Sequence, residues 1–111
     1  MAGTAATAGM LGVAMTLTAG LGTVASAAVF GQRLAGAADA AALAAADTVS
    51  GALPGAGPCD RAAAVAAADG ARLARCDLDR LIVTIRVDGA FLSVPASAWS
   101  RAGPPPEAPL P

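Results

Sequence analysis

Two cysteines, Cys59 and Cys76, are the residues of this sequence best suited to a chemical role. The chain has no His, so neither thiol has an imidazole that would activate it as a nucleophile. Two thiols without a His or a third Cys are also too few ligands for a zinc site. A disulfide formed in an oxidising compartment is therefore the favoured interpretation, and two buried free thiols are the alternative.

The carboxylates offer no catalytic pair. Asp77 and Asp79 are close in the sequence, but they fall where we expect a hairpin turn, and Asp is a common turn former. The chain lacks His, Lys and Tyr for acid–base work, and it has no Gly-rich loop followed by Lys that would bind phosphate. The sequence therefore predicts a protein that is not an enzyme, with no catalytic residue, metal, cofactor or small-molecule substrate.

Composition narrows the class of protein further. The 111 residues carry a formal net charge of −1, which excludes a strongly basic nucleic-acid-binding protein. The chain is 56% hydrophobic but only 3% aromatic, so most of its apolar content is Ala, which buries little area per residue. A small soluble domain of this kind is expected to need a staple. A disulfide between the two cysteines would contribute about 3 kcal/mol in the chain-entropy model.

A long uncharged segment precedes the part of the chain that contains the cysteines. No charged residue precedes Arg33, and a helix needs ~20 mainly apolar residues to cross a bilayer. We expect a retained membrane helix that spans about residues 8–30. The alternative is a signal peptide cleaved at Ala25-Ser26-Ala27, although no basic residue precedes the apolar run and the run is long for such a peptide. The position of Arg33 alone argues weakly against an outside C-terminus.

The helical pattern continues beyond the apolar segment. Residues 32–50 are mostly Ala, the best helix former, so we expect one helix from about Ala5 to Val49 within a helical region of residues 1–50. Gly31 and Gly36 are positions at which this helix can bend.

Small residues recur in the apolar segment at four-residue spacing, at Gly12, Thr16 and Gly20. This spacing is typical of close packing between membrane helices. In a segment this rich in Ala and Gly the same spacing also arises by chance, and both interpretations stay open.

A small soluble domain is predicted over residues 59–100, after a Gly- and Pro-rich linker at residues 51–58. A short helix from Cys59 to Ala68 should open it, with Gly70 as its terminator. The alternation of apolar and polar residues from Leu81 to Asp88 indicates a half-buried strand. We expect Ala71–Asp77 to pair with it across a turn at Leu78-Asp79.

The C-terminal part of the sequence is less regular. Residues 90–99 suit either a third strand or an apolar cover, with Trp99 as a hydrophobic cap on the hairpin. Residues 101–111 are rich in Pro and are expected to form a disordered tail. The predicted fold class is α+β, with a long N-terminal transmembrane helix, a short helix, and a β-hairpin or small antiparallel sheet.

Two long segments resemble one family. GQRLAGAADAAALAAADTVSG, which begins at Gly31, resembles the AADxAALAAA signature of actinobacterial TadE-like and TadG-like pilus-assembly proteins. PCDRAAAVAAADGARLARCDLDRLIVTIRV, which begins at Pro58, resembles the remainder of the small TadE-like proteins encoded near secretion and helicase genes in those bacteria. In them, too, a Cys opens an Ala-rich helix and a second Cys follows a Gly-Ala-Arg-Leu run. The resemblance covers about residues 3–88.

The resemblance implies a minor pilin or pseudopilin-like structural subunit of a Tad (Flp-type) pilus or secretion apparatus. Such a protein is a single-pass protein of the cell membrane, with its C-terminal part on the extracytoplasmic side. Its partners would be other pilin-like or Tad secretion-system subunits and membrane lipid, with no nucleic acid. Packing roles for Ala38 and Asp39 also follow from the resemblance. The sequence departs from the pilin pattern in that no Glu precedes Glu107 and Gly3 is the only early candidate for a cleavage-site glycine.

A hypothesis of a different class is a secreted small binding module with a cleaved signal peptide. Its hairpin or its Pro-rich tail would contact the target. The N-terminal sequence of the mature protein would distinguish it from the pilin-like subunit.

Overall fold

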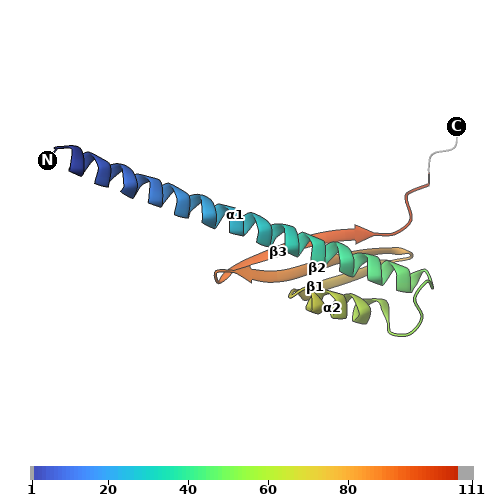
Figure 1. Ribbon diagram of the computed structural model, residues 1–111. Helices are drawn as coiled ribbons and strands as arrows, with labels where there is room; N and C mark the ends of the chain where they lie inside the picture. Colours follow the sequence, from blue (N-terminus) through green and yellow to red (C-terminus); the bar gives the residue numbers. More distant parts are fainter. Residues whose placement is uncertain (1, 108–111) are drawn as a thin grey trace. The chain divides into compact units, whose positions relative to one another are not determined.

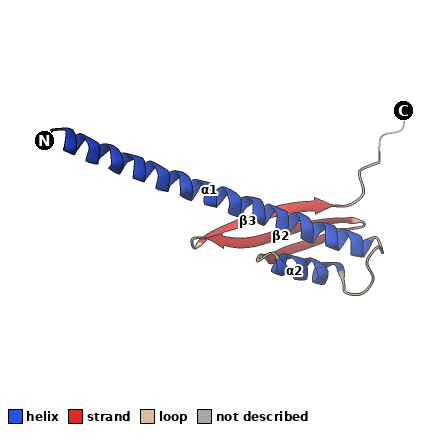
Figure 2. Ribbon diagram, viewed as in Figure 1, coloured by secondary structure: helices blue, strands red, loops and turns tan. Residues whose placement is uncertain are grey.

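The computed structural model describes residues 2–107, and within them the chain forms two helices and one antiparallel sheet of three strands in the order β1-β2-β3 (Figures 1 and 2). The predicted α+β fold class is confirmed. The elements are α1 (Ala2–Val49), α2 (Pro58–Ala68), β1 (Arg72–Asp79), β2 (Ile82–Phe91) and β3 (Val94–Ala102).

The chain divides into two compact units, with the boundary between Phe30 and Gly31. We call the described part of the first unit, residues 2–30, the N-terminal segment, and it consists of helix alone. We call residues 31–107 the head. The head is larger than the predicted domain of residues 59–100, because the C-terminal part of α1 belongs to it.

Alanine explains both the length of α1 and how its C-terminal part packs. Alanine has the highest helix propensity, and the helix continues through Gly31 and Gly36 as far as Val49. Gly51 then adopts φ 84°, a left-handed conformation that suits glycine at a helix C-terminus. Within the head, α1 buries one side at helical spacing. The buried residues are Leu34, Ala37, Ala38, Ala41, Ala42 and Ala45.

The sheet and α2 supply the rest of the core. Alternate side chains of β2 point to one face, where Val83, Ile85 and Val87 have no exposed surface. Helix α2 contributes Ala62 and Ala66 to the core of the head. Most of the buried side chains of the head are therefore small.

The turn between β1 and β2 lies two residues later than the sequence predicted. Leu78 pairs with Val83 and Asp79 with Ile82, so both residues belong to the ladder and not to the turn. The turn consists of Arg80 and Leu81, and Arg80 takes φ 57°. The prediction of a turn at Leu78-Asp79 was wrong because β1 continues through these two residues, and the connection that remains, Arg80-Leu81, is long enough to join antiparallel strands.

Residues 94–102 form a third strand, which decides between the two interpretations of residues 90–99. Pro95 is accommodated because β3 is an edge strand. The strand includes Arg101 and Ala102, so the prediction of a disordered tail was wrong for these two residues. The end of that predicted tail, residues 108–111, lies outside the described residues.

The chain passes very close to the β1–β2 turn as it leaves β3. A Cβ added at Gly103 would lie 2.8 Å from the carbonyl oxygen of Leu81 and 3.0 Å from the Cα of Ile82. Both contacts are with backbone, which cannot move aside as the end of a side chain can. Gly103 therefore lets the C-terminal segment cross the turn.

Candidate functional site

The two cysteines form a disulfide between the start of α2 and the middle of β1. Their Cα atoms are 5.9 Å apart, and 17 positions separate them in the sequence. Pro58, within the first turn of α2, fixes the backbone just before Cys59. The bond holds α2 against the sheet.

Eight large apolar side chains of the N-terminal segment are exposed in the structure. At 100° per residue they occupy roughly half of the helix circumference. Apolar side chains exposed in this way need lipid or another protein to cover them. The residues are Met10, Leu11, Val13, Met15, Leu17, Leu21, Val24 and Val29, each more than half exposed.

Five of the six Ser and Thr hydroxyl groups of the N-terminal segment are bonded within the helix itself. Each of the five donates to the carbonyl oxygen four residues earlier, at 2.8 to 3.1 Å, and Thr16 Oγ1 bonds to Gly12 O in this way. Such a hydroxyl needs no water. Within residues 2–107, α1 is the one helix long and apolar enough to cross a membrane, a property that signal sequences share.

The predicted helix-packing residues fall into two groups. Among the described residues, nothing lies within 4 Å of a Cβ built at Gly12 or at Gly20, so packing by Gly12, Thr16 and Gly20 stays a prediction. Ala38 is fully buried in the head, and the Asp39 carboxylate accepts a hydrogen bond of 2.5 Å from Ser100 Oγ of β3. Ala38 and Asp39 therefore pack α1 onto the sheet of its own chain.

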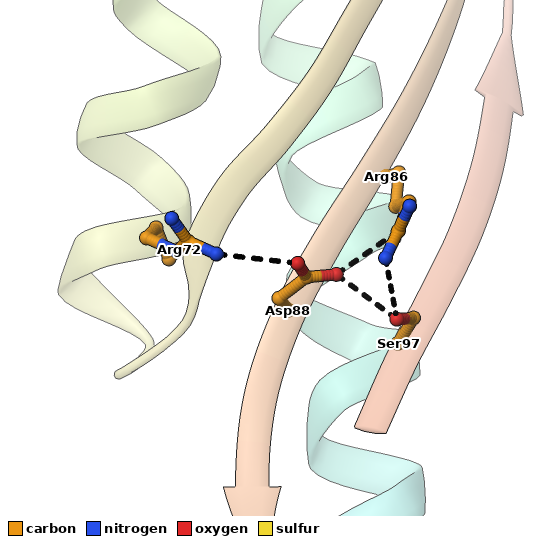
Figure 3. A network of polar contacts seen from close by, with 4 residues as sticks. All are labelled: Arg72, Arg86, Asp88 and Ser97. Atoms are coloured by element: carbon orange, nitrogen blue, oxygen red, sulfur yellow. Dashed lines mark hydrogen bonds and ion pairs between the residues drawn. The ribbon is translucent and has the colours of Figure 1, made fainter. Parts of the chain in front are cut away.

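The face of the sheet opposite the buried one carries a polar row across all three strands (Figure 3). Arg72 of β1 lies opposite Asp88 of β2, which lies opposite Ser97 of β3. Arg72 Nη2 is 3.3 Å from Asp88 Oδ2, and Ser97 Oγ donates to Asp88 Oδ1 at 3.0 Å. Arg86 donates to Asp88 Oδ1 through Nε at 3.0 Å and to Ser97 Oγ through Nη2 at 3.2 Å. We call these four residues the Asp88 network.

The charge of Asp88 is stabilised by its neighbours. The hydrogen bond from Ser97 is the largest influence that lowers the pKa of Asp88 below its ordinary 3.8, with Arg86 and Arg72 acting in the same direction against desolvation. The carboxylate is thus already occupied by donors and is a poor general base. The arrangement ties three strands together, and the Ser97 hydroxyl in it donates to a carboxylate that Arg72 and Arg86 already bind.

Trp99 also lies on this polar face. Its side chain is 55% exposed, and the Arg86 guanidinium carbon is 5.8 Å from the centre of its ring. This distance suits a cation–π contact. Trp99 therefore lies over a charged side chain of β2, on the polar face of the hairpin that it was predicted to cap.

We expect Asp88→Asn to destabilise the head at neutral pH and to lose this effect in acid. Because folding lowers the pKa of Asp88, its ionised form stabilises the fold above pH 3.8, and this contribution is lost as pH falls through the lowered pKa. Melting temperatures of wild type and variant, measured from about pH 7 to about pH 2, should converge at the acid end. Asp79→Asn, at an exposed position outside the network, is the matched control. A difference between wild type and Asp88→Asn that is equal at every pH would contradict the ionic role.

Sequence reasoning missed the Asp88 network because its members are far apart in the chain. Arg86 and Asp88 stand out as polar residues of β2, but pairing them with Arg72 and Ser97 requires the register of both strand pairs. The usable signal was the alternation in β3, where Ser97, Trp99 and Arg101 lie on one face and Ala98 and Ser100 on the other. The alternation is weak because the residues on the inner face of β3 are Ala and Ser, which are small and only weakly hydrophobic.

Comparison with known proteins adds no relative. No protein-family model matches the chain, and no curated protein or solved structure is similar enough to count as a match. Function must therefore be argued from the residues themselves.

Proposed function

We propose that this chain is a single-pass membrane protein of the TadE-like type, a minor pilin-like or pseudopilin-like structural subunit of a Tad (Flp-type) pilus or secretion apparatus. The observation that carries the proposal is the N-terminal segment. It is an uncharged helix with exposed large apolar side chains and with hydroxyls bonded inside the helix.

The dimensions of the segment suit a bilayer. At 1.5 Å per residue, residues 8–30 extend about 35 Å, against a hydrocarbon core of about 30 Å. Every backbone polar group in lipid must be bonded internally, and a continuous helix meets this need. The four Ser and Thr hydroxyls within residues 8–30 are all bonded inside the helix, which removes the remaining cost of those side chains in lipid.

The same segment offers a surface to neighbouring helices. On a helical projection Gly12, Thr16 and Gly20 fall within one narrow sector, and the large apolar side chains lie outside it. Small residues in such a row let two helices approach closely. Pilin-like or Tad secretion-system subunits would pack against this side, and lipid would cover the other.

The head supports an extracytoplasmic location and a structural role. Disulfides persist in oxidising compartments, and the Cys59–Cys76 bond would be kept on the outer side of a cell membrane. The charged side chains best placed for chemistry, those of the Asp88 network, are engaged with one another. A non-enzymatic subunit needs only this stable, inert head.

The boundary between Phe30 and Gly31 is compatible with a second candidate function, that of a secreted binding module. A cut after Ala27 would leave the head intact, because the head begins at Gly31. The product would be a secreted small binding module. The state of the mature N-terminus separates the two functions.

Fractionation of the native host tests the proposal. We expect the chain in membranes or in sheared pili, with residues 8–30 retained. Leu17→Arg places a charge in the middle of the segment and should shift the chain out of the membrane fraction. Leu43→Arg makes the same change in the head part of α1, at a side chain that is 58% exposed, and should leave the distribution unchanged. Exclusively soluble protein that begins at Ala28 would refute membrane retention.

A further inference from the structure

We propose that the tip of the β2–β3 hairpin, residues 89–96, inserts into the headgroup region of the bilayer that anchors α1. The ligand is lipid, and the tip is a second membrane contact besides the helix. This inference rests on the proposed function, because it requires the N-terminal segment to span a membrane.

The tip has the chemistry of a lipid contact. Leu92 is 74% exposed and Val94 is 63% exposed, more than any other large apolar side chain in the described part of the head. No charged residue occurs between Asp88 and Arg101. The tip can therefore leave water without burying a charge, which is the main barrier to entering lipid.

Turn geometry does not account for this choice of residues. Leu92 takes φ 49° and Ser93 takes φ 67°, so both are in the left-handed region. Two-residue hairpin turns of this kind favour Asn and Gly, and a bulky Leu is costly there. A strained, exposed Leu at a turn indicates a role outside the fold of the head itself.

The tip lies at the end of the head where α1 enters it. Ser100 of β3 is bonded to Asp39 of α1, and within the head β3 runs in the same direction as α1 (Figure 1). From Asp39 back to Gly31 the helix covers about 12 Å, and from Ser100 back to Val94 the strand covers about 20 Å. The tip therefore reaches at least as far as Gly31, just before Arg33, the first charged residue of the chain.

Within the sheet, charged side chains are absent from the tip and present at the opposite turn. The opposite turn, between β1 and β2, contains Arg80, and Asp77 and Asp79 lie just before it. Toward the tip the charges of the sheet stop at the paired residues Arg72 and Asp88. The tip therefore suits contact with lipid better than the opposite turn, because charged groups stay at the membrane–water boundary.

Fluorescence quenching by lipid tests the inference in the full chain. Trp99→Phe removes the only Trp, and a single Trp is then introduced by Leu92→Trp, Leu81→Trp or Leu17→Trp. Each of the three positions is at least 47% exposed, so the core of the head is unchanged. The variants are reconstituted into phosphatidylcholine vesicles with brominated acyl chains, and circular dichroism checks that each head is folded. Leu81→Trp, at the opposite turn, is the matched control, and Leu17→Trp reports on the anchor.

We expect strong loss of emission for Leu17→Trp, a smaller but clear loss for Leu92→Trp at headgroup depth, a blue shift for both, and little loss for Leu81→Trp. Quenching of Leu17→Trp without quenching of Leu92→Trp would overturn the hairpin inference and leave the anchor standing. Equal quenching of Leu92→Trp and Leu81→Trp would also overturn it, since the head would then adsorb without a preferred end. Absence of quenching for Leu17→Trp would refute the membrane anchor, and the inference with it.

Discussion

Ile85→Ala should lower the free energy of unfolding of the head by roughly 2–5 kcal/mol, the range for removing a buried aliphatic side chain. Ile85 has no exposed surface and lies at the middle of the central strand, opposite Cys76 on one side and Ser100 on the other. The side chains that α1 and α2 contribute around it are mostly Ala, which cannot extend to fill a cavity. We therefore expect a cost in the upper part of the range.

Denaturant unfolding of the full chain in detergent micelles, followed by circular dichroism, measures this change. Ile82→Ala is the matched control, because it removes the same atoms from the same strand at a half-buried position on the other face. We expect the control to cost much less. Similar losses for the two variants would mean that the core does not lie on the Ile85 face.

Loss of the disulfide is the second large effect that we expect. Reduction, or Cys59→Ser together with Cys76→Ser, should lower the free energy of unfolding by about 3 kcal/mol, because the closed loop restricts the unfolded chain. Small domains have total stabilities of only about 5–15 kcal/mol, so this loss is a large fraction of the whole. Helix α2 should be the first element to detach, since the bond joins it to β1.

Thermal unfolding of wild type and of the double Ser variant, each with and without a thiol reductant, measures this loss of stability. Reductant should lower the melting temperature of wild type and leave that of the double Ser variant unchanged, which separates the bond from other effects of the reagent. Equal stability of oxidised wild type and the double Ser variant would show that the bond contributes nothing. Two titratable thiols in protein exported to the oxidising side would show that it does not form there.

The parts of the fold that were predictable are those with a strong local signal. The absence of charge before Arg33 and the run of Ala predicted α1 to within a few residues at its start, since both properties act along one helix. The alternation of Val83, Ile85 and Val87 predicted β2 and its buried face. Gly and Pro at residues 51–58 predicted the linker, and the Ala-rich run after it predicted α2, because these preferences also act over a few neighbouring residues.

The remaining parts depend on contacts between distant segments. β3 turns its Ala residues toward the core, so hydrophobic alternation hardly marks it, and Pro95 argues against a strand until β3 is known to be at an edge. The early register shift between Leu73 and Arg75 also has no signature in the sequence. Asp39 could be singled out by resemblance, but its partner Ser100 is 61 positions away.

The four alanines Ala38, Ala41, Ala42 and Ala45, all without exposed surface, have a consequence for how this gene can change. One C-to-T transition in an alanine codon produces valine, which adds two methyl groups. At a fully buried position the added methyl groups overpack the core and force side chains or backbone to shift. On the exposed N-terminal segment the same transition adds apolar surface without any clash. Substitutions from Ala to Val that accompany a lower GC content would therefore be tolerated in the N-terminal segment of α1 and selected against in the part of α1 that belongs to the head.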